Sequence, residues 1–200
     1  MTGSSARSAG PARDGNAGEV IDLAANPPAD PHDVARTIVL RQLTAGPRSR
    51  AQLEEALAKR QVPAEAVVAV LDRMTEVGLI DDAAFADVWV RSRHSSRGLS
   101  RAALARELHR KGVAKEDAEE ALEQVDNDAE AQAAASLVAK RLPTLAGLDR
   151  SAQTRRLMGM LARRGYGPGV AGRAVRDALD ACQGPGDEVR SDDNLPDLAE

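Results

Sequence analysis

The sequence contains three copies of one apolar pattern, and this repetition limits the possible folds more than any other feature. From Leu53, Leu104 and Leu157, apolar residues follow four, nine and eighteen positions later in each copy. The copies are therefore 51 and then 53 residues apart. Apolar residues that recur every three or four positions are typical of helices with one buried face. A period of about fifty residues predicts tandem helical units that pack against one another.

Capping residues divide each unit into three helices. Ser49 and Ser100 stand before the second helix of their units, where a hydroxyl accepts a hydrogen bond from an orphan backbone amide. Gly112 and Gly165 close that helix in the later units, because glycine readily adopts the left-handed C-terminal turn. The predicted helices span residues 33–43, 50–60, 64–77, 82–94, 100–111, 115–125, 128–141, 151–164 and 168–180.

Composition agrees with an all-α fold. Hydrophobic residues make up 42% of the chain but aromatic residues only 2%, so alanine, leucine and valine must fill the core. Alanine and leucine favour helices, and no segment alternates apolar and polar residues as a strand does. We therefore predict an elongated, curved array of three-helix repeats with disordered N- and C-terminal tails. The predicted parts are an N-terminal tail (1–32), three repeats (33–80, 81–127 and 128–182) and an acidic tail (183–200).

The same composition suggests where the protein works. The single cysteine, Cys182, excludes an internal disulfide framework and suits a reducing compartment. No apolar run approaches the roughly 20 residues of a membrane helix, and the N-terminus lacks the apolar core of a signal peptide. We expect a soluble, cytoplasmic monomer that does not bind membranes.

Charge is distributed in blocks. Residues 91–115 contain eight basic residues and one acid, and residues 150–176 contain seven basic residues and no acid. On the helix at 100–111, Arg106 and Arg110 point away from the apolar face formed by Leu104 and Leu108. The positions that match Arg110 are Lys59 and Arg163, so a basic row recurs in every unit. Such a row predicts a polyanionic partner, either phosphate or an acidic protein surface. The candidate binding residues are Arg91, Arg93, Arg97, Arg101, Arg106, Arg110, Lys111, Arg155, Arg156, Arg163 and Arg164.

The chain has one tryptophan and one phenylalanine, Trp89 and Phe85, and they are four residues apart. This spacing places both rings on one face of a helix and indicates core residues, together with Leu104, Leu108 and Val113. Base stacking by Trp89 remains an alternative. Their counterparts are expected to be Val34 and Ile38 in the first unit, and Val138 and Leu142 in the third.

No residue pattern indicates catalysis. His32, His94, His109 and Cys182 lack the spacing of metal ligands, and the pair Asp81-Asp82 is explained by helix capping. The glycines of residues 165–169 lack the lysine and the preceding strand of a phosphate loop. No nucleophile stands with a base and an orienting group. We expect neither an enzyme nor a bound metal or cofactor.

The second unit resembles the RecX regulatory proteins of bacteria. The resemblance rests on an Asp-Asp-x-x-Phe-Ala opening, an aromatic four residues on, a basic loop with glycine, and a Glu-Leu-x-x-Lys-Gly-Val ending. The matching residues are Asp81, Asp82, Phe85, Ala86, Trp89, Arg91, Arg93, Gly98, Glu107, Leu108, Lys111, Gly112 and Val113. The other units match by phase, so the resemblance covers about residues 33–180; Gln61 departs from it, standing where Gly112 and Gly165 occur.

The resemblance implies a non-enzymatic, all-helical modulator of the RecA recombinase. Such proteins lie in the groove of the RecA filament on single-stranded DNA. They hinder ATP hydrolysis, strand exchange and the coprotease activity that starts the SOS response.

Two other classes of function fit the same residues. Three-helix units with a basic helix are also typical of tandem helix-turn-helix DNA-binding proteins, with the helix at 100–111 in the groove. The outward side chains of that helix include no Asn or Gln for adenine recognition, but weak non-specific DNA binding fits its charge. A helical scaffold for another acidic protein is the third class.

Overall fold

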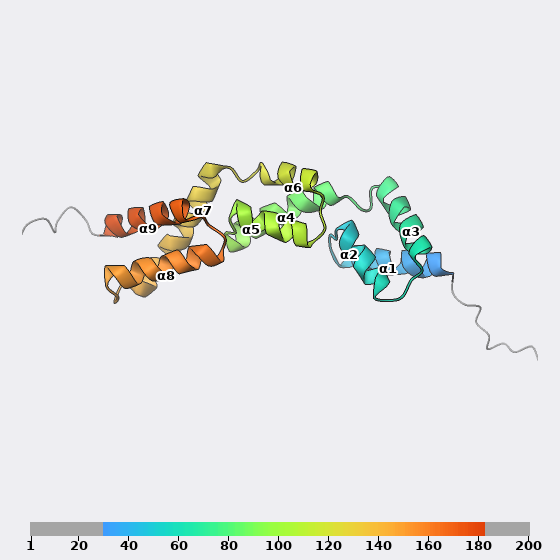
Figure 1. The fold of residues 1–200 in the computed structure, drawn as a ribbon, viewed down its shortest axis with the longest axis horizontal. Helices are drawn as coiled ribbons and strands as arrows, with labels where there is room; N and C mark the ends of the chain where they lie inside the picture. The colour runs from blue at the N-terminus through green and yellow to red at the C-terminus, as the bar shows by residue number, and fades with distance from the viewer. Residues whose placement is uncertain (1–29, 183–200) are drawn as a thin grey trace, which may run out of the picture. The chain divides into compact units, whose positions relative to one another are not determined.

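The computed structural model describes residues 30–182, and these residues form nine α-helices, one 3-10 helix and no strand (Figure 1). The helices fall into three consecutive groups of three, so the predicted all-α fold of tandem three-helix repeats is confirmed for the described residues. Their bounds are α1 (Pro31–Ala45), α2 (Arg50–Ala58), α3 (Ala64–Glu76), α4 (Asp82–Arg97), α5 (Arg101–Arg110), α6 (Lys115–Leu122), α7 (Asn127–Arg141), η1 (Leu142–Leu145), α8 (Arg150–Arg163) and α9 (Pro168–Cys182).

Every predicted helix is present, but the observed helix ends differ from the predicted ones by up to three residues. Helix α1 begins at Pro31, two residues before the predicted start, because proline suits the first turn of a helix. Helix α4 continues to Arg97 and ends at Gly98, which adopts the left-handed C-cap conformation. The predicted disordered tails lie outside the described residues except for residues 30–32.

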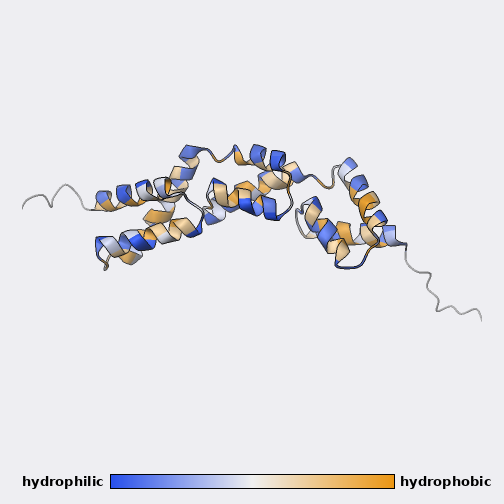
Figure 2. Ribbon diagram, viewed as in Figure 1, coloured by the Kyte–Doolittle hydropathy of each residue, from blue (hydrophilic) through white to orange (hydrophobic). Residues whose placement is uncertain are grey.

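Each repeat buries its own apolar cluster. Leu53 and Leu57 of α2, and the matching leucines of α5 and α8, are at most 1% exposed. Most helices carry hydrophobic and hydrophilic residues on different sides (Figure 2). The apolar residues predicted from the repeat therefore form the cores, with Val62 half-buried.

Many of these helices have a side-chain cap at their N-terminus. The hydroxyls of Ser49 and Ser100 accept hydrogen bonds from the amides of Gln52 and Ala103. The Asp81 carboxylate accepts one from the amide of Ala84 at 2.8 Å. Both serines are completely buried, whereas Asp149, which caps α8, is exposed.

The prediction that Val138 and Leu142 of the third repeat correspond to Phe85 and Trp89 is wrong. Ala86 and Val90 are the fully buried residues of α4, and in α7 this pattern falls on Ala134 and Val138. The counterpart of Trp89 is therefore Leu137 and not Leu142. The connection that contains η1, together with an extra first turn of α8, lengthens the third repeat between these helices, so the spacing of the later leucines does not apply upstream.

Consecutive repeats meet through the second helix of each repeat. The Ser49 hydroxyl donates a hydrogen bond to the carbonyl of Lys111 at 2.6 Å, across the junction of the first and second repeats. A Cβ atom at Gly112 would lie well under 3.0 Å from the Cβ of Ala51. Glycine is needed here both for a φ of +73° and for this close approach.

The second junction repeats this arrangement. The Ser100 amide donates to the carbonyl of Arg164 at 3.1 Å, and a Cβ at Gly165 would collide with Ser100 and Ala103. The Tyr166 hydroxyl also donates to the carbonyl of Gly98 at 3.1 Å.

A carboxylate from the next repeat completes each junction. Asp82 accepts a hydrogen bond from the backbone amide of Arg50 at 2.8 Å, and Glu130 accepts one from the amide of Arg101 at 3.1 Å. The pair Asp81-Asp82 is thus divided between a helix cap and a repeat junction. Burial raises the pKa of the Asp82 carboxyl, with the Arg50 amide acting in the opposite direction.

Candidate partner-binding surface

The exposed side of α5 carries two arginines. Leu104 and Leu108 are fully buried, while Arg106 and Arg110 are exposed and line a shallow hollow with Ala105 and His109. Their guanidinium groups form no ion pair within residues 30–182, although Arg110 Nε donates weakly to the carbonyl of Arg106 at 3.4 Å. Both side chains therefore remain available to an anionic partner.

The matching row continues in the third repeat but is neutralised in the first. Arg155, Arg156 and Arg163 on α8 are exposed and form no ion pair with any described residue. Lys59 is exposed as well, but its Nζ lies 2.7 Å from Glu55, and this contact lowers the pKa of the Glu55 carboxyl. Lys59, Arg110 and Arg163 all point outward, and the available charge lies on α5 and α8.

Two of the predicted binding residues are instead used within the chain. The Arg101 guanidinium donates to the carbonyls of Leu122 and Val125, at 2.8 and 3.4 Å, at the end of α6. Arg164 is half-buried, and its Nε donates to the carbonyl of Arg97 at 3.0 Å. These guanidinium groups satisfy orphan carbonyls at helix ends.

Trp89 forms a compact cluster at the edge of the second core. It is half-buried, and its Nε1 donates to Glu107 at 2.9 Å. The guanidinium carbon of Arg93 lies 4.1 Å from the centroid of its ring, and Lys111 Nζ lies 3.9 Å from it. Phe85 stacks at 5.8 Å between centroids. A base could stack on Trp89 only by displacing one of these groups.

The same cluster concentrates positive charge near the first junction. Burial lowers the pKa of Lys111, Glu107 opposes that shift, and the nearby Arg93, Arg48 and Arg110 add to it. Arg48 was not among the predicted residues, because it precedes α2 in the first repeat and only the packing of the repeats brings it to Lys111.

Of the other predicted residues, Phe85, Leu104, Leu108 and Val113 are buried. Arg91 and Arg97 are exposed in the second half of α4. The candidate cations therefore separate into outward-facing ones (Arg91, Arg97, Arg106, Arg110, Arg155, Arg156 and Arg163) and ones whose charged groups contact an aromatic ring or a helix-end carbonyl of the chain (Arg93, Arg101, Lys111 and Arg164).

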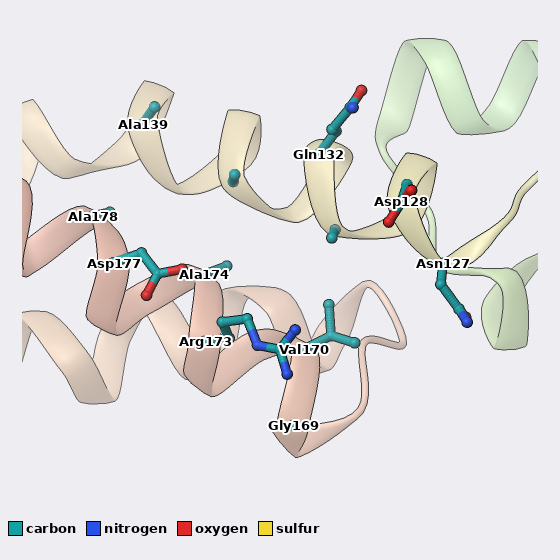
Figure 3. A pocket seen from close by; sticks show the side chains of 12 residues that line it. Asn127, Asp128, Gln132, Ala139, Gly169, Val170, Arg173, Ala174, Asp177 and Ala178 are labelled. Atoms are coloured by element: carbon teal, nitrogen blue, oxygen red, sulfur yellow. The ribbon is translucent and has the colours of Figure 1, made fainter.

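A groove also lies elsewhere, between α7 and α9. It has a volume of about 770 Å³ and is lined mainly by small residues, with Asp128, Arg173 and Asp177 among its polar side chains (Figure 3). In the described part of the chain, no group of three or more His, Cys, Asp or Glu side chains is placed to hold a metal ion. None of the described helices is both long and apolar enough to span a membrane.

Comparison with known proteins decides the family. Models of the first, second and third three-helix domains of RecX match residues 35–74, 81–122 and 128–175. The chain belongs to the RecX family. The three domain matches fall on the three structural repeats, and the resemblance found in the sequence is thereby confirmed.

Relatives over most of the chain are named regulatory proteins. Regulatory protein RecX of Streptomyces coelicolor is 54% identical over 154 residues, which are 77% of this chain and 82% of that relative. Regulatory protein RecX of Thermobifida fusca is 49% identical over 154 residues, 77% of this chain and 83% of that relative. The crystal structure of RecX from Lactobacillus salivarius shares the fold, with a TM-score of 0.68 at 18% identity over 77% of this chain and 99% of that chain.

Proposed function

We propose that this protein binds the RecA filament on single-stranded DNA in the cytoplasm and inhibits its ATPase, strand-exchange and coprotease activities. It would thereby restrain recombinational repair and the SOS response without catalysing a reaction. Membership of a family of regulatory proteins supports this proposal. The single structural observation that supports it is the set of exposed arginines without ion pairs on α5 and α8, represented by Arg106, Arg110 and Arg163.

The geometry suits an extended, repetitive partner. Arg110 and Arg163 occupy equivalent positions in successive repeats, and a planar guanidinium group can bind a carboxylate or a phosphate through two hydrogen bonds. Several weak ionic contacts made by one body strengthen binding through effective concentration when their spacing matches that of the partner. The first repeat contributes less, because Lys59 is paired with Glu55.

The direct test is RecA ATPase activity on single-stranded DNA. We expect the purified protein to inhibit it and the double variant Arg106→Glu/Arg110→Glu to inhibit much less. Both side chains are exposed, so the double variant should fold normally. A matched control is Arg36→Glu/Arg73→Glu, which reverses the same number of exposed charges on α1 and α3.

The two variants separate a specific surface from a general effect of charge. Equal loss of inhibition in both would make net charge the cause. Unchanged inhibition by the α5 variant would remove this surface from the proposal.

A direct DNA-binding function is the alternative. The seven basic residues without an acid between Arg150 and Arg176 favour it, because Lys and Arg side chains bind DNA by neutralising its phosphates. Equal binding to bare duplex DNA with and without RecA, with an affinity that falls steeply as salt is raised, would support this alternative. Binding that requires the filament supports the regulatory function.

A further inference from the structure

An apolar hollow opens at the far end of the third repeat. It has a volume of about 610 Å³ and lies between the end of α7, the start of α8 and the end of α9. Its apolar lining includes Leu142, Pro143, Leu148 and Leu179, and Cys182 lies at its edge where the described chain ends.

In the first two repeats, the corresponding corner is covered by the next repeat. The corner of the first repeat receives Gly112 against Ala51 and the Asp82 carboxylate on the Arg50 amide. The corner of the second repeat receives Glu130 on the Arg101 amide and Leu137, which lies under 3.0 Å from where a Cβ of Gly98 would be. Each covering element supplies a carboxylate, and at the second junction it also supplies a leucine.

The third corner does not suit the packing of another repeat of the same kind. Helix α8 begins one turn earlier than α2 and α5, and Gln153 occupies the position that Ser49 and Ser100 hold. A second copy of the chain would bring Gln61 where the junctions require glycine, and its side chain would meet the start of α8. A single stretch of chain fits this hollow better than a helical unit does.

We propose that residues 187–200 of the same chain cover this hollow, with Leu195 and Leu198 as the apolar side chains that enter it. These two leucines stand among acids, since residues 187–200 contain six acidic residues and one arginine. Lys140 and Arg141, in the last turn of α7 beside Leu142, are exposed and form no ion pair within residues 30–182. The segment therefore offers the same combination, leucine with carboxylate, that the second corner receives from α7.

The length of chain between Cys182 and Leu195 allows these leucines to reach the hollow. Leu195 is thirteen positions after Cys182, a reach of up to about 45 Å for an extended chain. Because the hollow begins at Cys182, a much more compact path also suffices, and the tether keeps the effective concentration of the segment high. This inference does not depend on the proposed function.

Cys182 is the natural probe, because it is the only cysteine and lines the hollow. The experiment measures the rate at which a neutral maleimide labels Cys182 in the full chain and in the full-length variant Leu195→Ser/Leu198→Ser. That variant keeps every charge of the segment. If the segment occupies the hollow about nine-tenths of the time, the wild-type thiol should react about tenfold more slowly than the variant thiol. A second variant, Asp192→Asn/Asp193→Asn, measures the effect of charge on the thiol.

Each outcome decides the proposal. Faster labelling in the leucine variant at every protein concentration supports it. Equal rates in wild type and leucine variant overturn it, and so does a change of rate seen only in the aspartate variant, which would make charge alone responsible. Protection that grows with protein concentration would assign the hollow to a second copy and also overturn it.

Discussion

Gly112→Ala tests how the repeats are joined. At a φ of +73°, an alanine costs about 1–2 kcal/mol of unfolding free energy from the backbone conformation. Its methyl group would also collide with the Cβ of Ala51, which belongs to a helix and cannot rotate away. Such overpacking costs about 1–3 kcal/mol more. We therefore expect a total loss of about 2–5 kcal/mol.

Gly78→Ala is the matched control. Gly78 has a φ of +71° but no atom within 4 Å of where a Cβ would lie, so only the backbone cost of about 1–2 kcal/mol applies. Urea unfolding, followed by Trp89 fluorescence and circular dichroism, gives the free energies. Ala51→Gly should partly rescue Gly112→Ala, because it removes the atom with which the new methyl group collides.

The comparison can refute the reasoning directly. If Gly112→Ala destabilises no more than Gly78→Ala, the close approach at the first junction has no energetic consequence. If the two probes report separate transitions only in Gly112→Ala, the substitution uncouples the repeats, which also fits the proposed junction.

Three further predictions concern single side chains. Burial raises the pKa of Tyr166 to about 12 from its ordinary value of 10. The contribution of the protonated Tyr166 hydroxyl to the free energy of unfolding should therefore be complete below about pH 10 and be lost as the pH rises through about 12. Because Tyr166 is the only tyrosine, tyrosinate absorbance measures this pKa directly, and a Tyr166→Phe variant should lack the associated fall in stability. Asp81→Ala should lower the unfolding free energy by about 1 kcal/mol through loss of the α4 cap, and an unchanged urea midpoint would contradict this. Trp89→Ala should cost about 1.5–3 kcal/mol, less than a fully buried tryptophan, since the ring is half-buried between Arg93 and Lys111; wild-type stability in urea would show that this cluster does not support the fold.

The repeat pattern predicted the cores because burial within a three-helix unit depends on local periodicity. Leu104 and Leu108 occupy the inner face of α5, as their spacing of four residues indicates. The same phase placed Arg106 and Arg110 outward. The pattern failed upstream in the third repeat, where the connection that contains η1 shifted the register of Val138 and Leu142.

Phase within one helix could not predict which cations are available to a partner. Nothing in the local sequence distinguishes Arg101 and Arg164 from an arginine that faces solvent, yet their guanidinium groups donate to backbone carbonyls at helix ends. Arg48 reaches the neighbourhood of Lys111 only through the packing of two repeats. These contacts join residues 21 to 67 positions apart, far beyond the range of helical periodicity.

The sequence by itself determined three helical units, their apolar faces and the outward direction of the basic row, because each depends on residues a few positions apart. Only the tertiary structure explains why the cap of the second helix is serine in two repeats (Ser49 and Ser100) but Asp149 in the third. It also explains why the residue after that helix is glycine in two repeats (Gly112 and Gly165) but Gln61 in the first. These serines and glycines are at contacts between repeats, where a small side chain or none is required. Asp149 and Gln61 occur where no neighbouring repeat packs in the described chain, so a larger exposed side chain fits.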